Sequence, residues 1–326
     1  MARETLDEFE RIRRFYAPLA GPGGLGLLDD AALVDCRGGR RLVVTADAIV
    51  ESVHYLSDDP PDLVARKLLR VNLSDLAAMA ARPLHYLLTT ALPPSFGAEW
   101  LAAFVRGLEE DQNRFGIDLL GGDSVATPGP ASLSLTAIGE VEAGMEVRRS
   151  GAQPGDLVWV SGTIGDSFLG LRARGGAYPE LPAEHRAAVI ARFQVPDPRV
   201  ELGPRLAGIA HAMIDVSDGL LADLGHICET SRVAAVVELE RVPLSPAARL
   251  LVAGDPGIRL RLATGGDDYE LLFSAPSNST LSIADLSGQL GVPITMIGRI
   301  ETGEGVRPVD GAGKTITVEA VGYRHF

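Results

Sequence analysis

Hydrophobic positions in the first half of the chain follow two periods, one typical of helices and one typical of strands. Apolar residues recur at three- and four-residue steps from Leu6 to Leu19, which predicts an amphipathic helix over 4–19. Runs rich in β-branched and aliphatic residues predict strands, and longer stretches with helical periodicity lie between them. Strands are expected over 31–35, 40–50, 85–92, 117–124 and 132–141, and helices over 62–82 and 99–116. This mixture indicates an α+β (mixed α/β) fold class.

The second half repeats this alternation after a turn signal. The sequence QPGD at 153–156 ends the first series of elements, and an apolar strand follows it. We therefore predict two domains, residues 1–148 and residues 149–326, and the chain length also suggests two. The second is expected to be an α/β sandwich-like domain. Its further strands are expected over 212–217, 234–240, 269–275 and 294–300, and its helices over 167–174, 184–193 and 219–231.

Two glycine-rich stretches have the look of phosphate-binding loops but lack the required context. GPGGLG at 21–26 has the spacing of a dinucleotide-binding loop, yet a predicted helix precedes it and Pro22 interrupts it. A flexible loop is the better interpretation. GAGKT at 311–315 lacks the first glycine of a P-loop, because Pro308 stands there. Its glycines suit the turn of a hairpin over 306–318.

Composition and charge limit the possible partners. Of the 326 residues 46% are hydrophobic and 22% charged, as in a folded globular protein, and the net charge of −13 argues against nucleic acid and anionic membranes as partners. Cys36 and Cys228 are isolated, which argues against a disulfide scaffold or a zinc site. The charged N-terminus has no apolar signal core, and no apolar run approaches the roughly 18 residues that span a bilayer. A cytoplasmic location is expected.

Carboxylates recur where their neighbours are apolar. Each one alone has an ordinary alternative as a helix cap, a turn residue or a satisfied polar residue. Several that converge would repel one another, and hard divalent cations such as Mg²⁺, which take oxygen ligands and substrate phosphates, would relieve that repulsion. No cluster of His and Cys residues argues for a softer metal. The aspartates in question are Asp29, Asp30, Asp47, Asp75, Asp123, Asp215, Asp218, Asp267 and Asp268.

Glycine pairs precede two of these aspartates, in GGDS at 121–124 and GGDD at 265–268. Residues without a side chain let a bulky phosphate approach the backbone amides. A metal site combined with phosphate binding suggests phosphoryl transfer. Because no Ser, Cys or His stands in a recognisable nucleophile–base arrangement, we expect direct in-line transfer without a phosphoenzyme.

Taken in order, the motifs resemble those of the thiamine-monophosphate kinases, within the aminoimidazole ribonucleotide synthetase-like ATP-binding enzymes. Individual motifs are only moderately specific, but the set is highly specific and spans essentially the whole chain. The motifs are LLDDAAL, VVTADAIVESVHY, VNLSDLAAMAA, LLGGDS, RRSGAQPGD, IDVSDGLLADLGHI, GGDDYELLF and the terminal GYRHF.

The resemblance implies a reaction in which ATP phosphorylates thiamine monophosphate to thiamine diphosphate. It also implies a homodimer whose N-terminal strands form a shared barrel, with ATP in a groove along it. By resemblance, the Mg²⁺ ligands would be Asp30, Thr45, Ala46, Asp47, Asp75, Asp123, Asp215 and Asp218, of which Asp47, Asp75 and Asp123 are the expected catalytic residues. The ATP contacts would be Gly122, Asp123, Arg149 and Ser217, and the thiamine monophosphate contacts would be His54, Asp267 and Tyr323.

Some of these roles have ordinary alternatives: His54 as a structural histidine, Tyr323 as a core residue and Arg149 as a solvated charge. The chain also departs from the family pattern. Leu27 and Leu28 replace an isoleucine and a glycine of the first loop, and Ala46 replaces a hydroxyl residue, so any metal contact there would use its backbone carbonyl. Asp267 stands where a glutamate is commoner.

Other functions within and outside this superfamily fit less well. A selenophosphate synthetase usually needs a reactive cysteine or selenocysteine in the N-terminal glycine-rich loop, and GPGGLG has none. A hydrogenase-maturation dehydratase needs a C-terminal cysteine, and this chain ends in His325 and Phe326. A non-catalytic nucleotide sensor would not need to retain the whole aspartate set.

Overall fold

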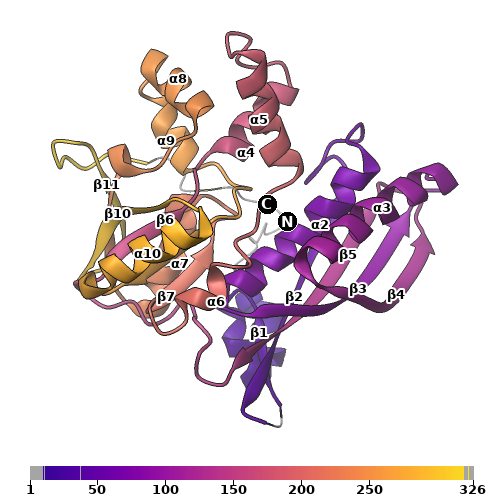
Figure 1. The fold of residues 1–326 in the computed structure, drawn as a ribbon, viewed down its shortest axis with the longest axis horizontal. Coiled ribbons are helices and arrows are strands. Elements are labelled where there is room, and N and C mark those ends of the chain that lie inside the picture. Colours follow the sequence, from indigo (N-terminus) through magenta and orange to yellow (C-terminus); the bar gives the residue numbers. More distant parts are fainter. Residues whose placement is uncertain (1–9, 11, 37, 319–321, 323–326) are drawn as a thin grey trace, which may run out of the picture.

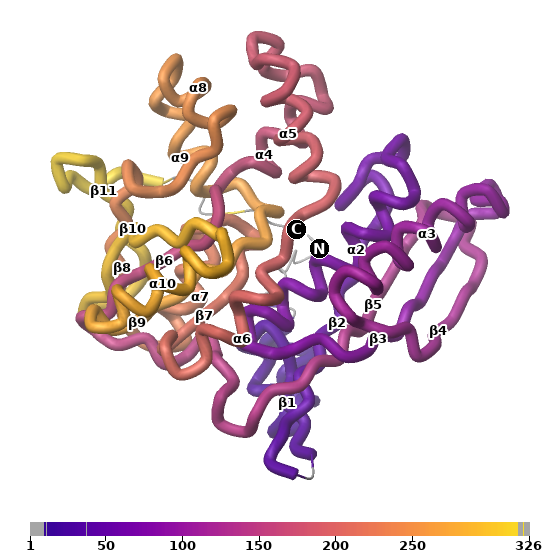
Figure 2. Tube along the Cα trace, in the orientation of Figure 1, coloured from indigo at the N-terminus to yellow at the C-terminus, as the bar shows by residue number. Residues whose placement is uncertain are grey.

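The computed structural model describes residues 10, 12–36, 38–318 and 322, and its strands form two separate sheets (Figure 1). Figure 2 shows the two halves of the chain next to each other, the indigo-to-magenta half on the right and the orange-to-yellow half on the left. The predicted mixed α/β fold in two parts is confirmed. The first sheet ends at Glu142 and the second begins at Leu157. A boundary between residues 148 and 149 lies in this interval and stays a prediction.

The first sheet has the strand order β1-β2-β5-β3-β4. Its neighbouring strands are antiparallel except β3 and β4, which run parallel because the helix α3 (Ala98–Phe115) connects them as a crossover. Buried positions alternate along β5, so one face of the sheet meets the core. The strands are β1 (Ala32–Asp35), β2 (Arg40–Val50), β3 (Arg82–Leu92), β4 (Asp118–Ala126) and β5 (Ser132–Glu142).

One long helix, α2 (Pro61–Ala78), forms the centre of the first half. Pro61 stands at its first turn, where the missing N–H of proline costs no hydrogen bond. The helix packs against β2, β5 and α3. Leu68, Leu73 and Leu76 are therefore completely buried. Because it is covered on several sides, any polar residue in α2 must find a partner inside the protein.

The edge strand β4 is unusual because all of its residues are exposed in the single chain. Leu119, Leu120 and Val125 contribute apolar surface there, and Leu87 of the neighbouring β3 adds to it. Edge strands with exposed apolar side chains are suited to pairing with another chain.

The second sheet has the order β11-β8-β10-β6-β9-β7, and only the β11–β8 pair is parallel. Helix α7 covers one face, where Leu221 and Leu224 share a core with Val160. Helix α10 covers the other face, where Ile283 packs with Trp159 of the sheet. This is the predicted sandwich-like arrangement. The strands are β6 (Leu157–Ser161), β7 (Ala212–Asp215), β8 (Ala234–Glu238), β9 (Leu271–Ala275), β10 (Ile294–Glu301) and β11 (Gly305–Val309), and the two helices are α7 (Leu220–Ser231) and α10 (Thr280–Leu290).

Four helices form a separate apolar cluster that projects from the second half, at the top of Figure 1. They are α4 (Asp166–Arg174), α5 (Ala183–Gln194), α8 (Pro246–Gly254) and α9 (Ile258–Ala263). The second half also contains α6 (Gly203–Leu206) and the single turns Leu239–Arg241 and Ser277–Ser279. None of the helices in the described part of the chain is both long and apolar enough to span a bilayer.

Most predicted elements are present, and the differences have local causes. The predicted helix over 4–19 falls partly outside the described residues, and its described part consists of the π-helical turn Ile12–Tyr16 and the 3₁₀ turn Ala17–Leu19. GPGGLG, predicted as a flexible loop, forms 3₁₀ turns over Pro22–Leu27 that are interrupted by a kink at Leu25 and Gly26. The predicted turn near the C-terminus is confirmed, since Val309 forms a bridge with Thr315.

Candidate active site

Three aspartates from distant parts of the sequence meet where the two halves touch. Asp30 precedes β1, Asp75 lies near the end of α2, and Asp215 ends β7. Each offers a carboxylate oxygen, and these atoms all lie within 4.8 Å of one another. The meeting follows from packing, because the last turns of α2 share an apolar core with the second sheet. The sequence prediction that Asp30, Asp75 and Asp215 converge is therefore met by the geometry, and their role as metal ligands stays a prediction.

Hydroxyl groups and one arginine hold these carboxylates in place. The Thr45 hydroxyl donates to Oδ2 of Asp75 at 2.7 Å, and the Ser74 hydroxyl donates to Oδ2 of Asp215 at 2.6 Å. Arg149 donates through two nitrogens to the two oxygens of Asp30, at 2.8 and 3.2 Å. Arg149 is thus not a solvated charge, because its guanidinium forms an ion pair within the aspartate cluster.

The electrostatics of the cluster favour proton uptake in the absence of a cation. Burial, together with the charges of Asp47 and Asp215, raises the pKa of Asp75 well above its usual value. Burial and the charge of Asp30 raise the pKa of Asp215 to about 8. Burial alone would lower the pKa of the Arg149 guanidinium, but the Asp30 carboxylate raises it overall. A buried group of mutually repelling carboxylates is a site that a divalent cation would stabilise.

The remaining predicted residues of β2 divide between the two faces of the strand. Thr45 and Asp47 face α2, where the Asp47 amide donates to Oδ1 of Asn72 at 3.0 Å. Ala46 lies between them and is exposed. Successive side chains of a strand point to opposite faces, so only the backbone of Ala46 is available on the side of Asp75.

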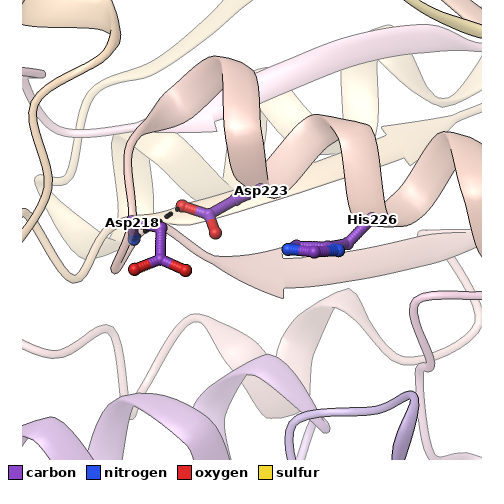
Figure 3. A group of neighbouring side chains, drawn as sticks. All are labelled: Asp218, Asp223 and His226. Atoms are coloured by element: carbon purple, nitrogen blue, oxygen red, sulfur yellow. Dashed lines mark hydrogen bonds between the residues drawn. The ribbon is translucent and has the colours of Figure 1, made fainter. Parts of the chain in front are cut away.

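A second acidic group lies at the start of α7, and Figure 3 shows its side chains. One carboxylate oxygen of Asp223 accepts the backbone N–H groups of Ser217, Asp218 and Gly219, at 3.1, 3.2 and 3.0 Å. In Figure 3 the carboxylate of Asp218 points away from α7. Ligand atoms of Asp218, Asp223 and His226 also lie within 4.8 Å of one another. Asp223 therefore fixes the loop that carries the predicted contacts Ser217 and Asp218.

Burial shifts the titration of this second group. It raises the pKa of Asp223 well above its usual value, and the neighbouring Asp218 charge adds to the effect. It lowers the pKa of His226, helped by the positive charge of Arg149. Both shifts disfavour the charged form of the side chain.

The predicted acceptor-binding residues His54 and Asp267 lie in two loops that a single lysine joins. The Lys67 ammonium donates to the His54 carbonyl oxygen at 2.8 Å and to Oδ2 of Asp267 at 3.1 Å. The third predicted contact, Tyr323, lies outside the described residues.

Asp123 and Gly122 are separate from the aspartate cluster within one chain. Strand pairing aligns Asp47 with Leu135, Leu88 and Gly122 on successive strands. With neighbouring strands about 4.8 Å apart, three steps across the sheet correspond to about 14 Å. Asp123 is exposed and belongs to neither acidic group of the described chain.

Gly122 also has a steric reason to be glycine. Its φ is +154°, and a Cβ atom there would lie 1.7 Å from the Leu88 carbonyl oxygen on β3. The close approach of the two strand backbones therefore requires a residue without a side chain.

Several residues that contact the site are not among the predicted ones. They share a simple signal, since a polar residue in an apolar helix needs a specific partner. Lys67, Ser74 and Asp75 lie seven and eight positions apart, which places them on one face of α2. The other additional residues give no such signal, and only their position next to a recognised motif points to them. The additional residues are Lys67, Asn72, Ser74 and Asp223. Asp29, a candidate aspartate to which the sequence gave no role, accepts the Arg149 amide through Oδ1 at 2.7 Å.

Family models match both halves of the chain. Residues 28–141 match the N-terminal domain of AIR synthase related proteins, and residues 153–311 match the C-terminal domain. Among curated proteins, the chain is 43% identical over 323 residues to a protein named thiamine-monophosphate kinase from Caulobacter vibrioides, covering 98% of this chain and 90% of that one. It is 39% identical to the protein of the same name from Escherichia coli K12, covering 98% of both.

Solved structures give the same grouping. The crystal structure of thiamine-monophosphate kinase from Stenotrophomonas maltophilia K279a superposes with a TM-score of 0.79 at 42% identity, covering 92% of this chain and 94% of that one. A structure described as AaThiL complexed with AMPPCP and TMP superposes with a TM-score of 0.86 at 30% identity, covering 100% of both chains. A HypE–HypF complex, with a TM-score of 0.75 at 18% identity, shares the fold alone.

Proposed function

The chain belongs to the AIR synthase related family and, within it, to the thiamine-monophosphate kinases, and we propose that it transfers the terminal phosphoryl group of ATP to thiamine monophosphate. The products are thiamine diphosphate and ADP. The observation that carries this proposal is the convergence of Asp30, Asp75 and Asp215 beside Arg149, at the contact between the two halves. The cytoplasm, where ATP is abundant, is the proposed location.

Mg²⁺ is the proposed cofactor because the residues fit it. The three carboxylates offer oxygen atoms only and are largely buried. Burial and the charges of neighbouring aspartates raise the pKa values of Asp75 and Asp215. We propose Asp30, Thr45, Asp47, Asp75 and Asp215 as ligands, with the Ala46 carbonyl and Asp218 as further ones. When bound, the cation supplies charge neutralisation for the phosphates of ATP.

Direct transfer between the two substrates is the proposed mechanism. The acceptor phosphate is itself the nucleophile, so the protein needs to position two polyanionic groups rather than to form a covalent intermediate. Arg149 is suited to a phosphate contact because its guanidinium already lies at the cluster and is held there by Asp30. Asp223 keeps Ser217 and Asp218 in a fixed loop conformation.

The acceptor is proposed to bind between the His54 loop and the Asp267 loop. The carboxylate of Asp267 suits the permanently positive thiazolium ring of thiamine. Asp267 has a φ of +69°, which is costly for a residue with a side chain, and a hydrogen bond from its amide to the Ser217 carbonyl oxygen at 2.8 Å helps to hold it. The segment that carries Asp267 is thereby tied to the loop that carries the proposed ATP contact Ser217.

A homodimer is proposed because it would explain both the exposed strand β4 and the position of Asp123. In a closed barrel of two sheets related by a twofold axis, β4 of each copy would continue the sheet of the other copy. This would cover Leu119, Leu120 and Val125, which are exposed in the single chain. It would also let Asp123 of one copy complete the metal site of the other.

The decisive experiment is incubation of the purified protein with ATP, MgCl₂ and thiamine monophosphate, with chromatographic detection of thiamine diphosphate. Product should form with Mg²⁺ and be absent with EDTA. An Asp75→Asn variant serves as the control for a contaminating kinase, because it retains the fold and loses one proposed ligand. Equal product formation by the wild type and this variant, or none by the wild type, would reject the proposal.

A further inference from the structure

Lys67 is a buried lysine for which the proposed reaction gives no role. It lies in the middle of α2 and is 2% exposed. Lysine is almost never this deeply buried unless its charge is paired. Its ammonium group has three donor positions, and partners from three separate segments surround it.

Two of these partners, His54 and Asp267, belong to the region proposed for the acceptor. The ammonium donates to the His54 carbonyl oxygen at 2.8 Å and to Oδ2 of Asp267 at 3.1 Å. It also lies 4.1 Å from the ring centroid of Phe193 in α5, a distance suited to a cation–π contact. Lys67 therefore connects the first half of the chain to two elements of the second half.

Both loops are fixed in detail by these contacts. The His54 ring accepts the Val50 amide through Nδ1 at 3.0 Å, while Lys67 holds the carbonyl of the same residue. The Asp267 carboxylate uses one oxygen for Lys67, and its other oxygen accepts the Tyr269 hydroxyl at 3.2 Å. The neutral imidazole then carries its proton on Nε2, and the carboxylate is held from two sides.

Another buried cation of the same helix shows what a purely structural role looks like. Arg70 is also 2% exposed, and it makes a two-nitrogen contact with the fully buried carboxylate of Asp111, at 2.6 and 2.8 Å. By contrast, the Asp267 side chain is 34% exposed, so the pair that it forms with Lys67 reaches solvent on the carboxylate side. The Lys67–Asp267 pair therefore lies at a surface that a ligand can reach, whereas the Arg70–Asp111 pair is buried.

We infer that Lys67 is a positioning residue for the acceptor substrate, which holds the His54 loop and the Asp267 carboxylate in the geometry that binds thiamine monophosphate. This inference rests on the proposed function. Lys67 acts through its neighbours and also offsets part of the Asp267 charge, so that the site presents an oriented carboxylate to the thiazolium ring.

Steady-state kinetics of a Lys67→Met variant test the inference, because methionine keeps the length and the contact with the Phe193 ring but removes the charge and the donors. The KM for thiamine monophosphate should rise about tenfold or more, and the KM for ATP should change less than about twofold. Because Lys67 acts through Asp267, the double variant Lys67→Met/Asp267→Ala should be little worse than the poorer single variant. Lys67→Arg keeps the charge, so its KM for thiamine monophosphate should lie between those of the wild type and Lys67→Met. If Lys67→Met does not fold, the two KM values of Lys67→Arg provide the test instead.

The matched control is Arg70→Met/Asp111→Asn, which removes a buried ion pair between α2 and α3 and leaves Arg66, the other partner of Asp111, paired with Glu110. It should lower the melting temperature and leave the ratio of the two KM values unchanged. Equal changes in both KM values in the Lys67 variants, or fully additive effects of Lys67→Met and Asp267→Ala, would overturn the inference. A wild-type protein that forms no thiamine diphosphate would instead refute the proposed function itself.

Discussion

The aspartate cluster should make the metal-free protein less stable as the pH rises. Burial and the charge of Asp30 raise the pKa of Asp215 to about 8 from the ordinary value of 3.8. Between these two values the folded protein keeps a proton that the unfolded chain releases. The stabilising contribution of Asp215 is therefore complete below its ordinary pKa. It is lost as the pH rises through the pKa of the folded state. Asp75 acts in the same direction, because its pKa is also raised.

The size of the effect follows from the pKa of Asp215. One pH unit corresponds to about 1.4 kcal/mol for each proton by which the two states differ. Between pH 6 and pH 8 Asp215 alone should lower the free energy of unfolding by about 2 kcal/mol, because it starts to titrate in the folded state near pH 8. Asp215 is 2% exposed, so solvent screening reduces this figure little.

Urea unfolding in EDTA at pH 6, 7 and 8 measures this dependence. An Asp215→Asn variant should lose the part of the slope that Asp215 contributes, because its amide does not titrate, and should keep the part that comes from Asp75 and Asp223. Mg²⁺ at about 10 mM should reduce or reverse the slope in the wild type, because the cation binds the deprotonated carboxylates and competes with protons. A wild-type stability that is constant or rises between pH 6 and pH 8 in EDTA would refute the reasoning, as would an Asp215→Asn variant with the full slope.

Four further outcomes are expected. Asp47→Asn and Asp75→Asn should each lower kcat at least about a hundredfold with the fold retained, because each removes a charge that holds the cation; near-normal turnover in both would refute the shared site. Incubation with ATP alone should leave the mass of the chain unchanged, and a covalently phosphorylated chain in the mass spectrum would contradict direct transfer. Asp267→Ala should raise the KM for thiamine monophosphate about tenfold and spare that for ATP, whereas Asp267→Glu should be tolerated better; equal effects on both substrates would assign Asp267 to the loop alone. Asp123→Asn and Asp75→Asn, inactive alone, should recover about a quarter of wild-type activity when co-expressed, since half of the dimers are mixed and each mixed dimer has one intact site; no recovery would argue against completion of the site by a second copy.

The regular elements of the first half could be predicted because their periodicity is strong and their ends are marked. Pro61 marks the start of α2, and apolar residues follow on several of its sides. Helices α8, α9 and α10 were not among the predicted elements. Helix α9 has only 6 residues, and the turn residues Asp255, Pro256 and Gly257 separate it from α8, so the sequence there resembles a connecting segment.

The partners within the site could not be predicted from local sequence. Arg149 and Asp30 are separated by 119 positions, and Lys67 and Asp267 by 200. Such pairs depend on how the two halves pack, which local periodicity does not determine. The sequence did point to aspartates within apolar segments as candidates for a shared site, and Asp30, Asp75 and Asp215 are three of the nine that it indicated. It could not show that Asp123 lies several strands away from them in the same chain.

The glycine pairs illustrate how a motif can point to the right place for a different physical reason. Both pairs suggested a close approach of phosphate to the backbone. In the structure Gly122 has no room for a side chain because of the Leu88 carbonyl, and a Cβ atom at Gly266 would lie 2.2 Å from the carbonyl oxygen of Ser217. Each glycine thus allows two backbone segments of the chain itself to pack together, and each thereby fixes the aspartate that follows. This steric requirement is independent of ligand binding, and the ATP contact of Gly122 stays a prediction.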